Sequence, residues 1–263
     1  QMPEKKSSLI DVDDDLIYRW RDLISETSKE KRIFVLSDTE TTCNQRKTND
    51  GLFNRVLEWS MIVCTENQDG TLSLLHDEKG KPVFIDQPIN FLSISPGLSK
   101  LEKSTTRVQP GAFKTHGISA EYLLGESEGG LGRGTLSQEA PSFKTVMAAV
   151  KTLFSGMSYA SPRECPVISF YNAPFDIGFL DIESELWEVP NIQSYFAVVD
   201  LLALVKKHCG FLKKKSLDDA YEWAKDVCPE YGQIERPYHS ALVDSSMMLP
   251  VYNAVISHLK SQS

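Results

Sequence analysis

The sequence IFVLSDTETT, residues 33–42, decides the predicted fold. Four apolar residues lead into two acids, Asp38 and Glu40, and then into hydroxyl residues, as expected where a buried strand reaches the rim of a sheet. Residues two apart on a strand share one face, so the two carboxylates repel each other unless a cation or a proton lies between them. A hard divalent metal ion prefers such oxygen ligands. The alternative is a strand end whose acids only face water, and partner acids elsewhere in the chain must decide between the two.

Composition sets broad limits on the class of protein. The chain has 263 residues, 41% of them hydrophobic and 24% charged, which suits one large globular domain. Its formal net charge of -8 argues against binding nucleic acid by bulk electrostatics. The five cysteines are scattered without a C-x-x-C pair, so they indicate reduced thiols rather than disulfides or a zinc site. With no apolar run long enough to cross a bilayer and no signal segment, we expect a cytoplasmic protein without a membrane partner.

Hydrophobic periodicity predicts an α/β protein. Strands are expected at 32–38, 55–65, from 72 onward, 166–170 and 195–199, with a hairpin turn at Asp69-Gly70. Helices are expected at 11–24, 141–154, 175–186, 201–208, 217–227 and 240–259, the last interrupted or kinked at Pro250. A hairpin first and β-α alternation afterwards predict a mixed five-stranded sheet with helices on both faces.

Two further stretches lack a regular period. Residues 88–110 contain a Pro-Gly break and no sustained pattern, which indicates a functional loop, a binding loop or a regular element that the pattern does not reveal. Residues 125–137 hold five glycines but lack the G-K-[S/T] ending of a phosphate-binding loop, and no strand leads into them. We expect this second stretch to be a mobile surface loop. Between the two, Ser119 is predicted to cap a short helix.

Two more segments carry acids near predicted helix starts. In YNAPFDIGFL, residues 171–180, Asp176 lies just inside a helix, and by itself it is most simply an acid favoured by the helix dipole. In YHSALVD, residues 238–244, His239 is placed on the incoming loop and Asp244 on the helix that follows. A lone histidine of this kind is ordinarily a satisfied surface or core imidazole.

Taken together, the three ordered motifs resemble a known family. D-x-E at a strand end, N-A-x-F-D-x-x-F-L and H-x-x-x-x-D resemble the DnaQ-like 3′→5′ exonucleases, the DEDD superfamily with histidine in its last motif. The similarity extends over about residues 33–254, and the segment from Pro110 to Ile118 is similar to one in proofreading subunits of bacterial replicases. The resemblance implies a ribonuclease H-like fold. It implies an exonuclease domain at 31–260 with insertions at about 88–110 and 125–140, after an extension of residues 1–30 with one helix. Tyr171 departs from the histidine common before the Asn-Ala pair.

The resemblance also implies a mechanism. Asp38, Glu40, Asp176 and Asp244 would hold two divalent cations, Mg²⁺ with Mn²⁺ able to substitute, and His239 would act as general base. The substrate would be a single-stranded or frayed nucleic acid 3′ end, DNA favoured, releasing nucleoside 5′-monophosphates. The resemblance leaves open whether a DNA polymerase is a partner, because no polymerase-binding tail is recognisable. Substrate contacts are expected from Thr39, Thr41, His116, Asn172 and Phe175. For His116, an equally good interpretation is a histidine at a helix entry that is bonded to the main chain.

Three alternatives stay open. The same family includes RNA-trimming exoribonucleases, and RNA is distinguished from DNA by contacts to the 2′ hydroxyl that sequence does not place. A catalytically idle nucleic-acid-binding module could keep the fold, although such a module has no reason to retain mutually repelling acids. A haloacid-dehalogenase-type phosphatase also begins with a strand that runs into acids. However, Glu40 is one methylene too long for its second acid, and the segment around Asp176 has no role in it.

Overall fold

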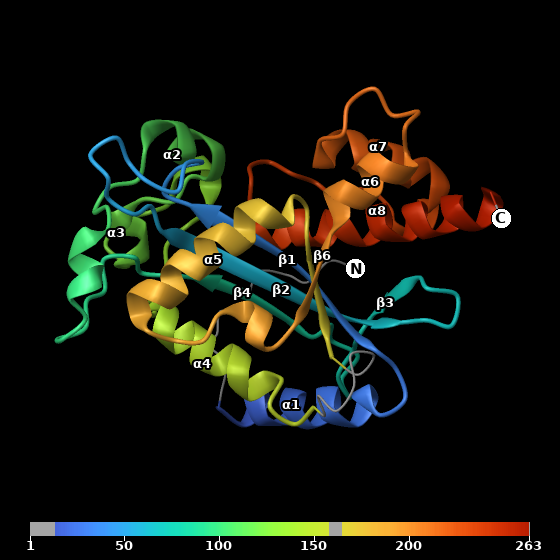
Figure 1. Ribbon diagram of the computed structural model, residues 1–263, viewed down its shortest axis with the longest axis horizontal. Coiled ribbons are helices and arrows are strands. Elements are labelled where there is room, and N and C mark those ends of the chain that lie inside the picture. Colours follow the sequence, from blue (N-terminus) through green and yellow to red (C-terminus); the bar gives the residue numbers. More distant parts are fainter. Residues whose placement is uncertain (1–13, 158–164, 263) are drawn as a thin grey trace.

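The computed structural model describes residues 14–157 and 165–262, which form one mixed sheet covered by helices on both faces (Figure 1). The strands follow the order β3-β2-β1-β5-β6, and β4 pairs with β2. The strands are β1 Ile33–Thr41, β2 Val56–Glu66, β3 Leu72–Leu74, β4 Phe84–Pro88, β5 Val167–Phe170 and β6 Ala197–Asp200. The α-helices are α1 Asp14–Ser28, α2 Pro110–His116, α3 Ala120–Leu123, α4 Phe143–Leu153, α5 Ala173–Trp187, α6 Leu201–His208, α7 Leu217–Val227 and α8 Ala241–Gln262. Short 3₁₀ helices are η1 Ser99–Lys103, η2 Gly130–Gly132, η3 Ile192–Ser194 and η4 Pro229–Tyr231.

Strand β1 lies in the middle of the sheet and sets which residues face which layer. It pairs antiparallel with β2 and parallel with β5. Ile33 and Val35 join the core beneath α1, α4 and α5, whereas Phe34 and Leu36 join the core beneath α6, α7 and α8. Because side chains alternate along a strand, Asp38 and Glu40 continue the face that α8 covers. Thr39 continues the opposite face.

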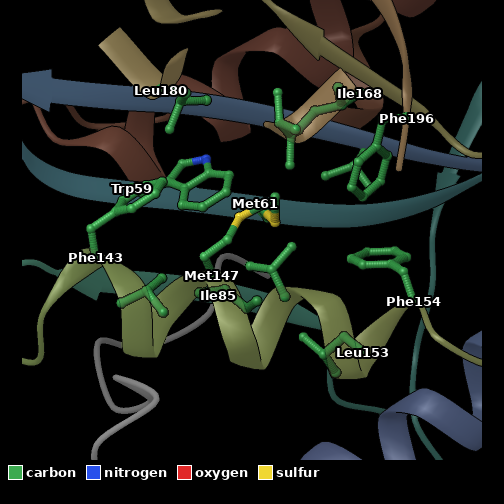
Figure 2. Close-up of a cluster of buried hydrophobic side chains, with 14 of the residues drawn as sticks. Trp59, Met61, Ile85, Phe143, Met147, Leu153, Phe154, Ile168, Leu180 and Phe196 are labelled. Carbon is green, nitrogen blue, oxygen red and sulfur yellow. The ribbon is translucent and has the colours of Figure 1, made fainter. Parts of the chain in front are cut away.

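The core beneath α4 and α5 is built from large aromatic and apolar side chains (Figure 2). Trp59 of β2 stacks on Phe143 of α4 with ring centroids 5.9 Å apart. Burial of side chains of this size contributes on the order of 2–3 kcal/mol each. This packing fixes the layer from which α5 approaches the sheet.

Two predictions about regular elements were wrong. The sheet has six strands, because β3 and β4 share one edge of β2: β3 pairs with Cys64–Glu66 and β4 with Glu58–Ile62. Strand β4 ends at a proline, and only its register with β2 reveals it. Helix α8 continues through Pro250, so of the interruption or kink predicted there the interruption is wrong. The proline removes one main-chain hydrogen bond, but it is buried. Ser245 before it and Asn253 after it are hydrogen-bonded to Ser60 of β2 and to the main chain of Leu72 in β3.

The glycine-rich segment, residues 125–137, is not a free loop. Gly129 and Gly134 form an antiparallel bridge around η2, and Arg133 is only 9% exposed. The expectation of a mobile surface loop is therefore wrong at Arg133. The predicted cap is confirmed, since the Ser119 side chain accepts a hydrogen bond from the main-chain N–H of Tyr122.

Two predictions from composition can be compared with the described residues. All five cysteines are free thiols, as predicted. Among the helices of residues 14–157 and 165–262, none combines the length and apolar character needed to span a membrane.

Candidate active site

The predicted acids come from three elements that meet at one end of β1. Asp38 and Glu40 lie on β1, Asp176 in the first turn of α5, and Asp244 in the first turn of α8. His239 lies in the segment that leads into α8. Ligand atoms of Glu40, His239 and Asp244 lie within 4.8 Å of one another, a grouping that could hold a metal ion. The fold thus brings together segments about two hundred residues apart.

Asp176 is fixed to the back of β1 through Thr39. Its Oδ1 accepts hydrogen bonds from the Thr39 main-chain N–H at 3.1 Å and from the Thr39 hydroxyl at 2.7 Å. Burial raises the pKa of Asp176 to about 7, although the two bonds from Thr39 oppose that rise. Both bonds use the same oxygen, so Oδ2 is left for another ligand.

The turn between β5 and α5 is held by Asp200, a residue to which the sequence motifs assign no role. Its Oδ1 accepts from the main-chain N–H of Asn172 at 3.1 Å and of Ala173 at 3.2 Å, and its side chain also caps α6 through Leu202. Asn172 adopts a left-handed conformation with φ of 78°. Asp200 thereby sets the direction in which α5, and Asp176 with it, leaves the sheet.

The acids on β1 are electrostatically unbalanced. Burial raises the pKa of Asp38 well above its ordinary value, and the carboxylates of Asp176, Asp244 and Glu40 raise it further. Burial likewise raises the pKa of Glu40, with Glu58 and Asp244 adding to it. The buried Oε1 of Glu40 has no hydrogen-bond partner among the described residues. Such an oxygen, aimed into a group of carboxylates, fits the ligand set of a hard divalent cation.

One positive side chain, missed by the sequence analysis, reaches into this group. Arg236 donates to Asp244 from Nε at 2.7 Å and from Nη2 at 2.6 Å, and to Asp218 from Nη1 at 2.6 Å. Its Nη2 also lies 2.7 Å from Nδ1 of His239. Both oxygens of Asp244 therefore accept from Arg236, and a cation that binds Asp244 has to compete with this guanidinium. The only sequence signal was a basic residue three positions before His239.

His239 combines an accessible ring with a fixed main chain. Its side chain is 45% exposed, and Nδ1 lies 3.3 Å from Oδ2 of Asp244. Its main-chain N–H donates to the carbonyl of Thr115 at 3.1 Å. Its carbonyl accepts from Arg133 at 3.0 Å. The imidazole can therefore exchange protons with solvent while the main chain that carries it is held on both sides.

The five residues predicted to contact substrate differ in what they offer. Thr39 is committed to Asp176, and the Thr41 hydroxyl donates to the carbonyl of Cys43 at 2.7 Å. His116 is buried; Nε2 lies 3.1 Å from the Thr41 carbonyl, and Nδ1 accepts from Ile118 N–H at 3.0 Å. Burial lowers the pKa of His116 to about 4. The ring of His116 is thus bonded to the main chain, which was one of the two hypotheses for this residue. Asn172 is exposed, and Phe175 is half-buried beside Phe179.

The architecture and the acid group define a class of protein: an α/β chain with the ribonuclease H-like fold of the 3′-exonucleases. No family model matches the sequence. A 3′-exonuclease solved for 3′-end specific recognition of histone mRNA stem-loop has a TM-score of 0.54 at 11% identity, covering 88% of this chain and 82% of that one. The nuclease domain of 3′hExo, a DEDDh family member, bound to rAMP, has a TM-score of 0.50 at 13% identity, covering 89% and 93%.

Sequence comparison gives a more particular relationship. The chain is 30% identical over 152 residues to DNA polymerase III subunit epsilon of Escherichia coli (strain K12), covering 56% of this chain and 50% of that protein. It is 32% identical over 152 residues to the same subunit of Salmonella typhimurium (strain LT2), with the same coverage. The chain spans about half the length of the curated relatives it matches. Over the matched segment it is homologous to the epsilon subunit of DNA polymerase III.

Proposed function

We propose that this chain is a metal-dependent 3′→5′ exonuclease. It hydrolyses the terminal phosphodiester bond of single-stranded or frayed nucleic acid, DNA favoured, and releases nucleoside 5′-monophosphates. The observation that carries the proposal is the convergence of Asp38, Glu40, Asp176 and Asp244 with His239 at the end of β1. We assign the activity to residues 31–260, with residues 1–30 as an extension and insertions at about 88–110 and 125–140.

The four acids fit a pair of divalent cations, Mg²⁺ or Mn²⁺. They offer only oxygen ligands, their mutual repulsion adds to the raised pKa of Asp38 and of Glu40, and Glu40 keeps one buried oxygen without a described partner. Asp38 is our choice for the bridging ligand because the other three carboxylates surround it. Asp176 acts in part through water, since Thr39 holds its Oδ1. When bound, such cations lower the pKa of an attacking water and stabilise the leaving 3′ oxygen.

His239 is the proposed general base. Its ring is accessible and lies beside Asp244, and histidine is the side chain that most often serves as a general base. It takes the proton of the attacking water and passes it to solvent. Arg236 contacts Nδ1 of the ring and both oxygens of Asp244, so a movement of its side chain away from them would free the base and the ligand together.

The proposed substrate follows from the surroundings of the acids. The half-buried ring of Phe175 offers a face on which a terminal base can stack, and Thr39, Thr41 and Asn172 lie on the two segments that border the acids. The homology to a DNA polymerase subunit favours DNA. It also makes a DNA polymerase the partner to test, by co-purification with a replicative polymerase.

The decisive assay uses oligonucleotides labelled at either end. With Mg²⁺ we expect a 5′-labelled single strand to shorten one nucleotide at a time, a 3′-labelled strand to release labelled mononucleotide at once, and EDTA to stop both reactions. Matched DNA and RNA strands, single and double, report the substrate class. Failure to degrade any of the four with Mg²⁺ or Mn²⁺ would overturn the proposal and favour a binding module. Covalent capture of Asp38 by a phosphoryl analogue would favour a phosphatase.

The assignment of His239 has its own test. His239→Ala should lower kcat by roughly 10²–10⁴-fold, as expected when a general base is removed. The four acids remain in place, so cation binding measured by calorimetry should persist. A loss in kcat below tenfold would remove His239 from this role.

A further inference from the structure

The glycine-rich segment delivers a buried arginine to the site. The main chain of this segment contacts the main chain of the turn after α2. Gly130 N–H donates to the Gly117 carbonyl at 2.7 Å. A Cβ on Gly117 would lie 2.3 Å from the Gly130 carbonyl oxygen. Gly117 also has φ of +71°, where a side chain is strained. Only glycines permit this approach. It places Arg133, one residue beyond η2, inside the protein.

Arg133 contacts the segments on both sides of the site. Nη1 donates to Oε2 of Glu58 on β2 at 2.5 Å, and Nη2 donates to the carbonyl of His239 at 3.0 Å. Nε donates to the carbonyl of His116, and the guanidinium lies 4.8 Å from the ring centre of Tyr238. The guanidinium is planar, with donors in a fixed fork. One side chain thus joins β2, the end of α2 and the His239 segment.

Glu58, the partner of Arg133, is bonded to the first residue of α8. Its Oε1 accepts the main-chain N–H of Ala241, the first residue of α8, at 2.8 Å. The ion pair is therefore hydrogen-bonded at two points of the same segment: Arg133 donates to the carbonyl of His239, and Glu58 accepts from the N–H of Ala241. Asp244 follows in the same turn of α8. The first N–H groups of a helix have no partner within the helix, so an acceptor here fixes where α8 begins.

From this geometry we infer that Arg133 is a positioning residue for the proposed exonuclease reaction. Together with Glu58 it sets the placement of His239 and of the first turn of α8, which carries Asp244. Arg133 touches no candidate ligand atom itself, so it acts through the main chain of residues 239–241. Displacements of about 1 Å at a reacting group can cost on the order of 10²-fold in rate. The inference rests on the proposed function and gives a role to a segment outside its motifs.

A second buried ion pair provides the matched control. Arg55 and Glu183 are 1% and 0% exposed in their side chains and lie 2.7 Å apart, close to the 3% and 2% of Arg133 and Glu58. Arg55 otherwise donates to the Phe91 carbonyl and the Ser104 hydroxyl. Within the described part of the chain, neither Arg55 nor Glu183 is hydrogen-bonded to His239 or to the four acids. If Arg133 only stabilised the fold, changing either arginine would have the same kind of effect.

The test is Arg133→Lys, which keeps the charge and loses the fork. On a single-stranded DNA oligonucleotide with Mg²⁺, at a temperature where all proteins are folded, we expect kcat to fall about 10- to 100-fold and KM to change less than about threefold. Arg55→Lys should lose stability yet keep kcat. Leu131 lies in η2, two residues before Arg133; it is exposed and has a left-handed main-chain conformation. Leu131→Asn should therefore match the unaltered protein in both stability and kcat.

Hydrogen exchange provides a readout independent of activity. In Arg133→Lys without substrate, peptides spanning residues 237–243 should exchange about tenfold faster or more, while β1 and β2 keep their protection. Should Arg133→Lys fail to fold, Glu58→Gln replaces it, with the same expectations. Unchanged kcat in an active protein, or a loss of kcat without faster exchange in 237–243, would overturn the inference. If the unaltered protein degrades no strand, the proposed function fails. Unchanged exchange in residues 237–243 would still overturn the inference in that case.

Discussion

Two regions of the molecule hold ionisable side chains away from water: the acids at the end of β1 and the pair Arg55–Glu183. In the pair each charge has an opposite charge beside it, whereas the acids at the end of β1 lie mainly beside one another. Oε1 of Glu183 accepts from Arg55 Nε at 2.7 Å and from Val56 N–H at 3.0 Å, and Oε2 accepts from Arg55 Nη2 at 2.9 Å. Asp38 and Glu40 instead have raised pKa values, and one oxygen of Glu40 has no described partner. A fully paired buried charge holds structure together. An unbalanced group of acids keeps a capacity for cations.

The largest expected effect is on catalysis at the unbalanced group. Asp38→Asn keeps the shape of the side chain and removes its charge, so activity should fall roughly 10³-fold or more, because cation stabilisation of the reaction is worth several kcal/mol. Without metal the variant should be as stable as the unaltered protein or more so, because repulsion among the acids is relieved. Oligonucleotide degradation and thermal unfolding in EDTA measure the two. Retained activity would remove Asp38 from the ligand set.

The balanced pair should respond in the opposite way. Glu183→Gln leaves the guanidinium of Arg55 buried without its counter-charge, which costs about 3–5 kcal/mol of unfolding free energy. Urea denaturation measures this loss. Turnover per folded molecule should be unchanged, since within the described residues the pair is not hydrogen-bonded to the acids at the end of β1. A variant with normal stability and impaired turnover would reverse the comparison between the two regions.

The pH dependence of metal-free stability should reveal the unbalanced acids. The folded-state pKa of Asp176, raised to about 7 by burial, lies above its value of about 4 in the unfolded chain. Its contribution to stability is therefore present below about pH 4 and is lost as the pH rises toward 7, because the native state binds the proton more tightly. Thermal midpoints in EDTA between pH 5 and 8 should fall less in Asp176→Asn. Mg²⁺ should restore more stability at pH 8 than at pH 5. Parallel curves for the two proteins in EDTA would contradict this account.

The smallest expected effect concerns Arg236, whose guanidinium is bound to Asp244. Arg236→Met removes the guanidinium that occupies both oxygens of Asp244, so a divalent ion no longer has to displace it. The side chains of this pair are only 13% and 7% exposed, and a hydrogen bond to a charged group is worth about 1.5 kcal/mol or more, so Mn²⁺ affinity measured by calorimetry should rise about tenfold. Arg46→Met, which changes an exposed arginine bonded to the carbonyl of Pro174, is the control. Equal or weaker Mn²⁺ binding in Arg236→Met would show that Arg236 does not compete with the ion.

Much of the fold was predictable because its signals are local. Helices α6 and α7 begin and end where their periodicity predicts, and β1 was recognised from its apolar run and its two acids. Strand β4 was missed because its pairing with β2, not its own sequence, makes it a strand. The interruption predicted at Pro250 was wrong, because hydrogen bonds of Ser245 to β2 and of Asn253 to β3 hold α8 on both sides of the proline.

The sequence by itself determined the acids at the end of β1, the helices that carry Asp176 and Asp244, and the order of the motifs, because spacing along a strand or a helix fixes which side chains share a face. Only the tertiary structure decided which charges meet. Arg133 pairs with Glu58 across 75 positions of chain, Arg55 with Glu183 across 128, and Arg236 reaches Asp244 from outside α8. A buried charge takes whatever partner the packing places beside it, and no local pattern encodes that partner.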